Sequence, residues 1–181
     1  VSPDELELLR RLRLNVEVQI EDLAAHYARR LAQGGGTSSL SAGTTYGQWL
    51  TPPFGQGGMG GYYTFAEIES VLDQMRATYP QFVSQKMSIG QTIQGRDIWM
   101  IRVSDNPDVD EDEPEARIDA MHHAREPQGM QTTLYFLSYL FEEYGSDPVA
   151  TYLLDERELY VVPCVNPDGY EFNRSQAPGG G

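Results

Sequence analysis

The chain has 181 residues, of which 40% are hydrophobic, a length and composition that admit one domain or a small domain with part of another. Its formal net charge of -14 at pH 7 argues against nucleic acid or an anionic membrane surface as a partner, because either would repel it. The single cysteine, Cys164, excludes an internal disulfide, and no uninterrupted apolar run is long enough to span a membrane.

Residues 1–33 show the pattern of a helix, a strand and a second helix. Ser2-Pro-Asp-Glu5 is a capping box with proline in the first helical position, and leucines follow at helical spacing. Apolar and polar residues alternate over 15–20 as in a half-buried strand, and Asp22 can cap the second helix. We therefore expect a small helix-strand-helix unit ahead of the main domain.

Residues 34–61 are the most glycine-rich part of the chain and hold 10 of its 18 glycines. Such a segment has too few apolar side chains to order itself, so we expect a linker that is the most mobile and protease-sensitive region. The exceptions are side chains that can dock on a neighbouring surface: Tyr46, Trp49, Leu50 and Phe54.

The main domain begins with a helix and a pair of strands. Thr64-Phe-Ala-Glu67 is a second capping box, and the apolar side chains that follow predict a helix as far as Tyr79. Residues 82–89 and 96–103 read as an antiparallel strand pair. Arg96 falls at or near their turn, where we expect it to be solvated.

Seven carboxylates crowd into residues 105–115, together with Pro107 and Pro114. Carboxylate oxygens are what Ca²⁺ requires, but their spacing here differs from that of an EF-hand loop. We therefore expect a solvated acidic loop, with a calcium site as the alternative.

A strand and a helix meet just after the acidic loop. Residues 116–121 alternate as a strand, and Pro127 opens a helical pattern that runs to about residue 144. His123 and Glu126 lie at the junction, at the carboxyl end of the strand, where open sheets collect their sites. Imidazole and carboxylate are good Zn²⁺ ligands, and the three-residue spacing lets both reach one metal ion.

The last elements return to the same edge of the sheet. A short helix is expected from Pro148 to about Glu156, and the almost continuously apolar run 159–165 predicts a strand buried on both faces. Asn166-Pro-Asp-Gly then predicts a turn near His123, in which Asp168 serves the backbone rather than catalysis. Residues 62–181 thus predict an α/β domain whose mixed sheet carries helices on both faces.

Two motifs, His123-Ala-Arg-Glu-Pro and Asn166-Pro-Asp-Gly-Tyr, resemble those of the zinc carboxypeptidase family. The resemblance implies that His123 and Glu126 are ligands of one zinc ion and that Arg125 lies on the substrate or oxyanion side. It implies removal of C-terminal amino acids from peptides and proteins. In this chemistry zinc polarises the scissile carbonyl and lowers the pKa of a bound water to about 7.

Residues 1–33 are similar to the end of the activation segment of such precursors. That similarity implies a secreted zymogen. The accessible linker is where an activating protease would cut, and the alternative is a plain spacer between domains, which would have the same composition. The family also uses a third ligand histidine and a glutamate general base, and no histidine follows Glu126 in this chain. We therefore expect both groups downstream of Gly181, and residues 1–181 alone to be inactive. The alternatives are a related zinc amidase or deacylase, and a non-catalytic binding module that kept the fold.

Overall fold

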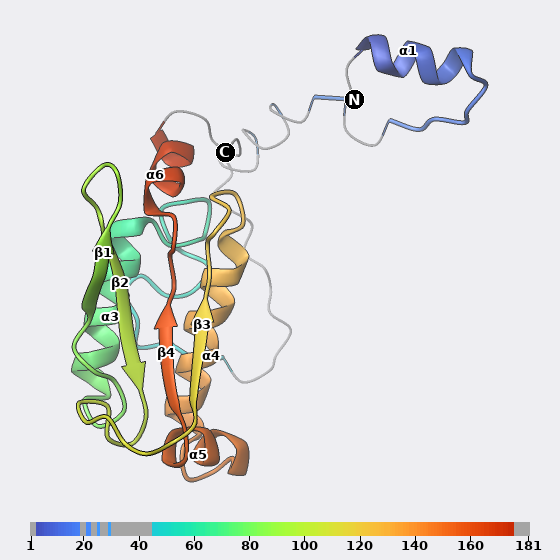
Figure 1. Ribbon diagram of the computed structural model, residues 1–181. Helices are drawn as coiled ribbons and strands as arrows, with labels where there is room; N and C mark the ends of the chain where they lie inside the picture. Colours follow the sequence, from blue (N-terminus) through green and yellow to red (C-terminus); the bar gives the residue numbers. More distant parts are fainter. Residues whose placement is uncertain (1–2, 19–20, 23–24, 26–28, 30–44, 176–181) are drawn as a thin grey trace.

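The computed structural model describes residues 3–18, 21–22, 25, 29 and 45–175 (Figure 1). Its helices and strands follow the predicted order closely from residue 62 onward. In chain order they are α1 (Pro3–Arg11), α3 (Phe65–Thr78), β1 (Met87–Gln91), β2 (Asp97–Val103), β3 (Glu115–Asp119), α4 (Pro127–Glu143), α5 (Pro148–Asp155), β4 (Glu158–Val162) and α6 (Pro167–Ser175).

The four strands form one mixed sheet in the order β1-β2-β4-β3. The hairpin β1-β2 is antiparallel, β2 and β4 are antiparallel, and β3 runs parallel to β4. Val161 of β4 is paired with Ile101 on one side and with Ile118 on the other. The continuously apolar run therefore became an inner strand with a neighbour on each side, and all of its residues except the half-buried Tyr160 are buried.

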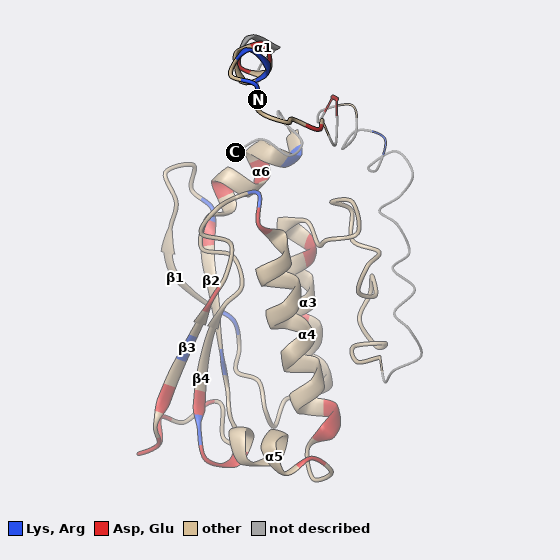
Figure 2. Ribbon diagram, turned by 90° about the vertical axis from the view of Figure 1, so that its right-hand side faces the viewer, with Lys and Arg blue, Asp and Glu red and all other residues tan. Residues whose placement is uncertain are grey.

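Two long helices, α3 and α4, lie side by side on one face of the sheet, and α5 lies at its lower end (Figures 1 and 2). We expected helices on both faces, but the helices in the described part of the chain cover only this one. The opposite face is open, and all five residues of β1 are exposed. The sequence pattern identified the helices but not the side of the sheet to which each one packs.

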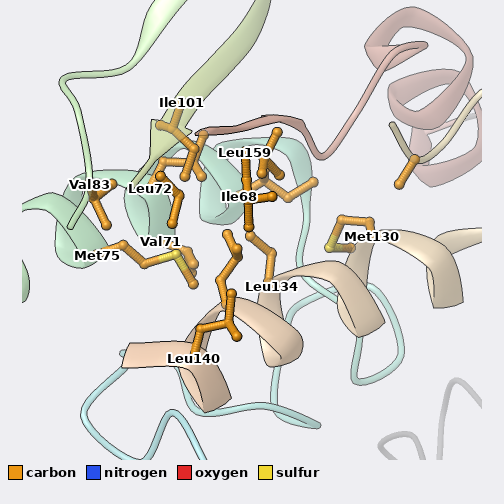
Figure 3. Close-up of a cluster of buried hydrophobic side chains, with 14 of the residues drawn as sticks. Ile68, Val71, Leu72, Met75, Val83, Ile101, Met130, Leu134, Leu140 and Leu159 are labelled. Atoms are coloured by element: carbon orange, nitrogen blue, oxygen red, sulfur yellow. The ribbon is translucent and has the colours of Figure 1, made fainter. Parts of the chain in front are cut away.

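The core fills the space between the sheet and the two helices (Figure 3). Leu72 and Met75 of α3 meet Leu134 of α4 there, and all three are at most 1% exposed. The capping box that starts α3 is present in full, since Thr64 accepts from the Glu67 N–H and Glu67 accepts from the Thr64 N–H. Other core residues labelled in the figure are Ile68, Val71, Val83, Ile101, Met130, Leu140 and Leu159.

The N-terminal unit is described only in part. The first helix is present as α1, although Ser2 of its predicted capping box lies outside the described residues. Residues 14–18 form no strand, because a strand needs a neighbour and the described chain offers none there. Asp22 accepts a hydrogen bond from the Ala25 N–H, as a helix cap does, while most of the predicted second helix lies outside the described residues.

Residues 45–61 differ from the linker that glycine content suggested. Leu50 is 1% exposed and belongs to the core, and Phe54 packs against Tyr63 and Tyr135. The segment turns repeatedly at glycines with positive φ, such as Gly47 at 72°. Glycine therefore serves tight turns in an ordered segment here. The remaining part of the expected linker, residues 34–44, lies outside the described residues.

Candidate metal centre

The candidate site lies where β3 and β4 end together at the same edge of the sheet. Parallel pairing continues past both strands, because Ala120 N–H donates to the Val162 carbonyl and Val165 N–H donates to the Ala120 carbonyl, both at 3.0 Å. The Asn166 N–H then donates to the carbonyl of Met121 at 3.1 Å. The two motifs identified in the sequence are thus brought together by backbone hydrogen bonds, as predicted.

His123 and Glu126 face each other at this edge. His123 Nδ1 lies 3.0 Å from Glu126 Oε2, and both side chains are more than half exposed. Glu126 is the N-cap residue of α4 but its carboxylate makes no capping bond, so it is free to turn toward His123. A turn bond from the Glu126 N–H to the His123 carbonyl, at 3.1 Å, fixes the spacing of the two residues.

This pair fits part of a zinc site. A nitrogen and a carboxylate oxygen that converge at an exposed strand end are ligand types that zinc accepts, and their exposure leaves room for other ligands. Within residues 45–175, however, the clusters of three or more candidate ligands contain neither His123 nor Glu126. The described chain thus offers two candidate ligands, whereas a catalytic zinc usually has three from the protein.

Arg125 lies between the two candidate ligands in sequence. Its side chain is exposed and makes no ion pair with any residue in the described part of the chain. A guanidinium in this state can bind a carboxylate or a polarised carbonyl from solution.

Asn166 ties the second motif to the first. Its Nδ2 donates to the His122 carbonyl at 3.2 Å, and its Oδ1 accepts from the Gly169 N–H at 3.0 Å. The predicted turn is therefore the capped start of α6, with Pro167 in the first helical position. A Cβ at Gly169 would lie 2.9 Å from the Cβ of Ala124, so glycine allows the helix to approach the loop that carries His123.

Asp168 fastens α6 to the tip of the β1-β2 hairpin. Its carboxylate accepts from Thr92 Oγ1 at 2.8 Å, the Gln94 N–H at 3.0 Å and Arg96 Nη1 at 2.6 Å. Arg96 was expected to be solvated, which is wrong, because its guanidinium is paired with this carboxylate. Burial raises the pKa of Asp168, but the bonds from Thr92, Arg96 and Gln94 outweigh burial and hold that pKa below its usual range.

The acidic loop also has partners that its sequence did not reveal. Oxygen atoms of Asp110, Glu115 and the buried Glu158 lie within 4.8 Å of one another, as do those of a second group, Asp105, Glu111 and Glu113. Glu158 is 0% exposed and is paired with Arg102 at 3.3 Å. The loop therefore folds back on the start of β4, and the choice between a solvated loop and a calcium site stays a prediction.

Cys164 follows β4 and is buried. Its pKa is raised to about 12, above all by burial, so the sulfur is a neutral thiol at physiological pH. Cys164 is therefore a packed side chain rather than a nucleophile.

A model of the zinc carboxypeptidase family matches residues 68–179, which is more than half of the chain. The zinc carboxypeptidase of Saccharothrix mutabilis subsp. capreolus is 39% identical over 116 residues, covering 64% of this chain and 26% of that protein. Carboxypeptidase A1 of Bos taurus is 35% identical over 115 residues, again 64% of this chain and 26% of that one. The chain thus spans about a quarter of the length of these relatives.

Solved structures show the same architecture. Bovine thrombin-activatable fibrinolysis inhibitor in complex with tick carboxypeptidase inhibitor gives a TM-score of 0.54 at 28% identity, over 64% of this chain and 35% of that chain. Thrombin-activatable fibrinolysis inhibitor alone gives a TM-score of 0.70 at 22% identity, over 97% of this chain and 40% of that chain. This likeness shows the fold. The fold is therefore of the mixed α/β carboxypeptidase class. The chain belongs to the zinc carboxypeptidase family, whose members are hydrolases.

None of the described helices combines the length and the apolar character that a membrane-spanning helix requires.

Proposed function

We propose that the chain is part of a metallocarboxypeptidase in which His123 and Glu126 hold one zinc ion. The observation that carries this proposal is the 3.0 Å approach of His123 Nδ1 to Glu126 Oε2 at the shared end of two parallel strands. The relatives named above are carboxypeptidases, which favours this activity over a zinc amidase, a deacylase or a binding module.

Each residue of the site has a distinct part in the proposal. Zinc, when bound, supplies a Lewis acid for the scissile carbonyl. Arg125 binds the substrate at its carboxylate or at the developing oxyanion, because its guanidinium is exposed beside the two ligands. Asn166 positions the loop before His123 by its bond to the His122 carbonyl. A third ligand histidine and a glutamate base are expected outside residues 1–181.

Zinc titration of the whole chain tests the ligand assignment. We expect weak zinc binding that His123→Ala or Glu126→Gln abolishes, because two protein ligands leave the metal largely hydrated. His122→Ala is the matched control, since His122 is an exposed neighbour that the proposal leaves out. Competition against a chromophoric chelator measures the affinities. Equal losses in His122→Ala and His123→Ala would refute the assignment.

Hydrolysis of a blocked dipeptide tests the proposed need for further groups. We expect no turnover by residues 1–181, because neither a third ligand nor a base is assigned within them. Tight one-to-one zinc binding with turnover that depends on His123 would show that another residue of this chain supplies the missing ligand.

We also propose that residues 1–33 are a pro-segment, that an activating protease removes it and that the protein is secreted. Support comes from the helix α1, the composition of the segment that follows it and the family to which the chain belongs. Mass spectrometry of the protein in culture medium tests this. Recovery of the uncut chain inside cells only would contradict it.

A further inference from the structure

The backbone turns sharply just before His123. Met121 has a φ of 60°, in the left-handed region that strains a residue with a Cβ, and its side chain is 3% exposed. Two residues after this buried side chain the chain presents the exposed His123. A strained conformation of this kind persists only where the surrounding structure holds it. The groups that hold Met121 therefore also decide where His123 lies.

Three successive carbonyls in this turn accept hydrogen bonds from two residues of the chain after β4. The Ala120 carbonyl accepts from the Val165 N–H at 3.0 Å. The next two carbonyls both accept from Asn166: that of Met121 from its N–H at 3.1 Å, and that of His122 from its Nδ2 at 3.2 Å. The direction of the loop that carries the candidate metal ligand thus depends on where Asn166 is fixed.

Asn166 is fixed by the first turn of α6, which is held on two sides. The Tyr170 N–H donates to the Asn166 carbonyl at 3.1 Å, and Tyr170 Oη donates to the Tyr63 carbonyl at 2.7 Å. Tyr170 is 1% exposed, so this side of the helix is anchored in the core. The other side carries Asp168, whose carboxylate is bonded to the β1-β2 hairpin.

The tip of that hairpin is shaped in advance to receive a carboxylate. The Thr92 N–H donates to the Arg96 carbonyl at 2.9 Å, and the Arg96 N–H donates to Thr92 Oγ1 at 3.0 Å. These bonds close the turn around Gly95, which has a φ of 77°. The closed turn presents a hydroxyl, a backbone N–H and a guanidinium together. Hairpin tip and α6 lie at the same end of the sheet (Figure 1).

We propose, on the basis of the zinc ligands proposed above, that Asp168 is a positioning residue for His123. Asp168 holds the start of α6 against the hairpin, and Asn166, two residues before it, then holds the strained turn at Met121. The turn in its place keeps His123 within reach of Glu126. The hairpin thereby contributes to the metal site although no residue of its tip is a ligand.

Zinc titration of the whole chain, followed through the NMR signals of the His123 and Glu126 amides, tests the consequence for the metal. Asp168→Asn keeps the shape of the side chain but loses its charge. We expect zinc affinity to fall by about threefold to tenfold, less than for a direct partner of a ligand. Arg96→Gln should lower the affinity similarly. Arg96→Lys should restore most of the loss, because a single guanidinium nitrogen bonds Asp168.

Asp147→Ala is the matched control for stability. Asp147 also holds the start of a helix, since its carboxylate accepts from the Val149 N–H at 2.7 Å, and its removal should destabilise the fold. The helix that it caps, α5, precedes β4 and lies at the opposite end of the sheet from α6 (Figure 1). Asp147→Ala should therefore leave the zinc affinity unchanged.

Hydrogen exchange of the metal-free protein separates positioning from general stability. In Asp168→Asn the Asn166 N–H, which bonds the Met121 carbonyl, should exchange about tenfold faster or more, because the turn opens locally. In Asp147→Ala its exchange should be unchanged, although that variant is also less stable.

Equal losses of zinc affinity in Asp168→Asn and Asp147→Ala would overturn the inference, because general stability would explain both. Unchanged exchange at Asn166, or unchanged zinc affinity, in Asp168→Asn would also overturn it. Zinc binding that His123→Ala does not weaken would instead refute the proposed ligands, and exchange at Asn166 would still decide whether Asp168 holds the turn.

Discussion

The carboxylate of Asp168, in the first turn of α6, accepts three hydrogen bonds from the β1-β2 hairpin. The contribution of Asp168 to stability should therefore depend on pH. An acid whose pKa is lowered by folding stabilises the folded state above its unfolded pKa, near 4, and this is lost as pH falls through the folded pKa. Asp168→Asn should therefore lower the midpoint of thermal unfolding at pH 7. The difference from wild type should stay constant from pH 7 to about pH 5 and should shrink as the pH falls below about 4.

Calorimetry over that pH range measures the difference, with Asp112→Asn as the control because Asp112 is exposed in the acidic loop. A difference between Asp168→Asn and wild type that is constant with pH would show that shape, not charge, explains the role of Asp168.

Asp105 should behave in the opposite way. Burial raises its pKa first, and repulsion by Glu111 and Asp155 raises it further. The charged form is therefore unfavourable in the folded state at pH 7, and this penalty disappears once the pH falls below the unfolded pKa. Asp105→Asn should raise the unfolding midpoint at pH 7 and lose that gain on acidification. A midpoint below that of wild type at pH 7 would contradict the argument.

The residues that could be predicted were those with local partners. Thr64 and Glu67 are three positions apart, so the capping box was visible in the sequence. Arg96 and Asp168 are 72 positions apart, and only the folded sheet reveals their ion pair. The pair His123 and Glu126 was also local, which is why its approach was predicted while the partners of Glu158 were not.

Among the elements, α4 depends on apolar side chains that its spacing predicted. Leu134 is 0% exposed in the layer between α4 and the sheet. Leu134→Ala should lower the free energy of unfolding by about 2–5 kcal/mol, since it leaves a cavity. Val149→Ala, at a position of α5 that is 59% exposed, should change it by less than about 0.5 kcal/mol. Urea denaturation measures both, and equal effects would contradict the core described here.

Strand prediction succeeded where a partner existed and failed elsewhere. Residues 158–162 became a strand between two neighbours, whereas the alternating residues 15–18 remained unpaired. Alternating apolar and polar residues indicate a segment with one buried face. A strand also needs hydrogen bonds to a second strand, and the sequence does not show which segment that second strand is. The prediction of a linker was wrong for residues 45–61 for a related reason. Their glycines give the composition of a linker, and only the folded structure shows that they form tight turns beside α4.

For the whole molecule, the open face and free edges of the sheet should govern association. β1 is an edge strand with every residue exposed, including Ile89 at 53%. Exposed edges pair with other chains unless charges prevent it. Ile89→Lys should therefore reduce concentration-dependent association without lowering the unfolding midpoint by more than about 2 °C.

Sedimentation velocity over a range of concentrations measures this association, with Asp112→Lys as a control for added positive charge. If both variants reduced association equally, net charge rather than the β1 edge would be the cause.

The strand order also dictates a sequence of assembly. β2 and β3 follow one another along the chain but are separated in the sheet by β4, which pairs with both. During synthesis the hairpin β1-β2 can form early, while β3 has to wait until residues 158–162 leave the ribosome. His123 and Glu126 therefore emerge well before the strand that fixes their loop. A nascent chain halted before Glu158 would hold both candidate ligands but no edge of the sheet on which to place them.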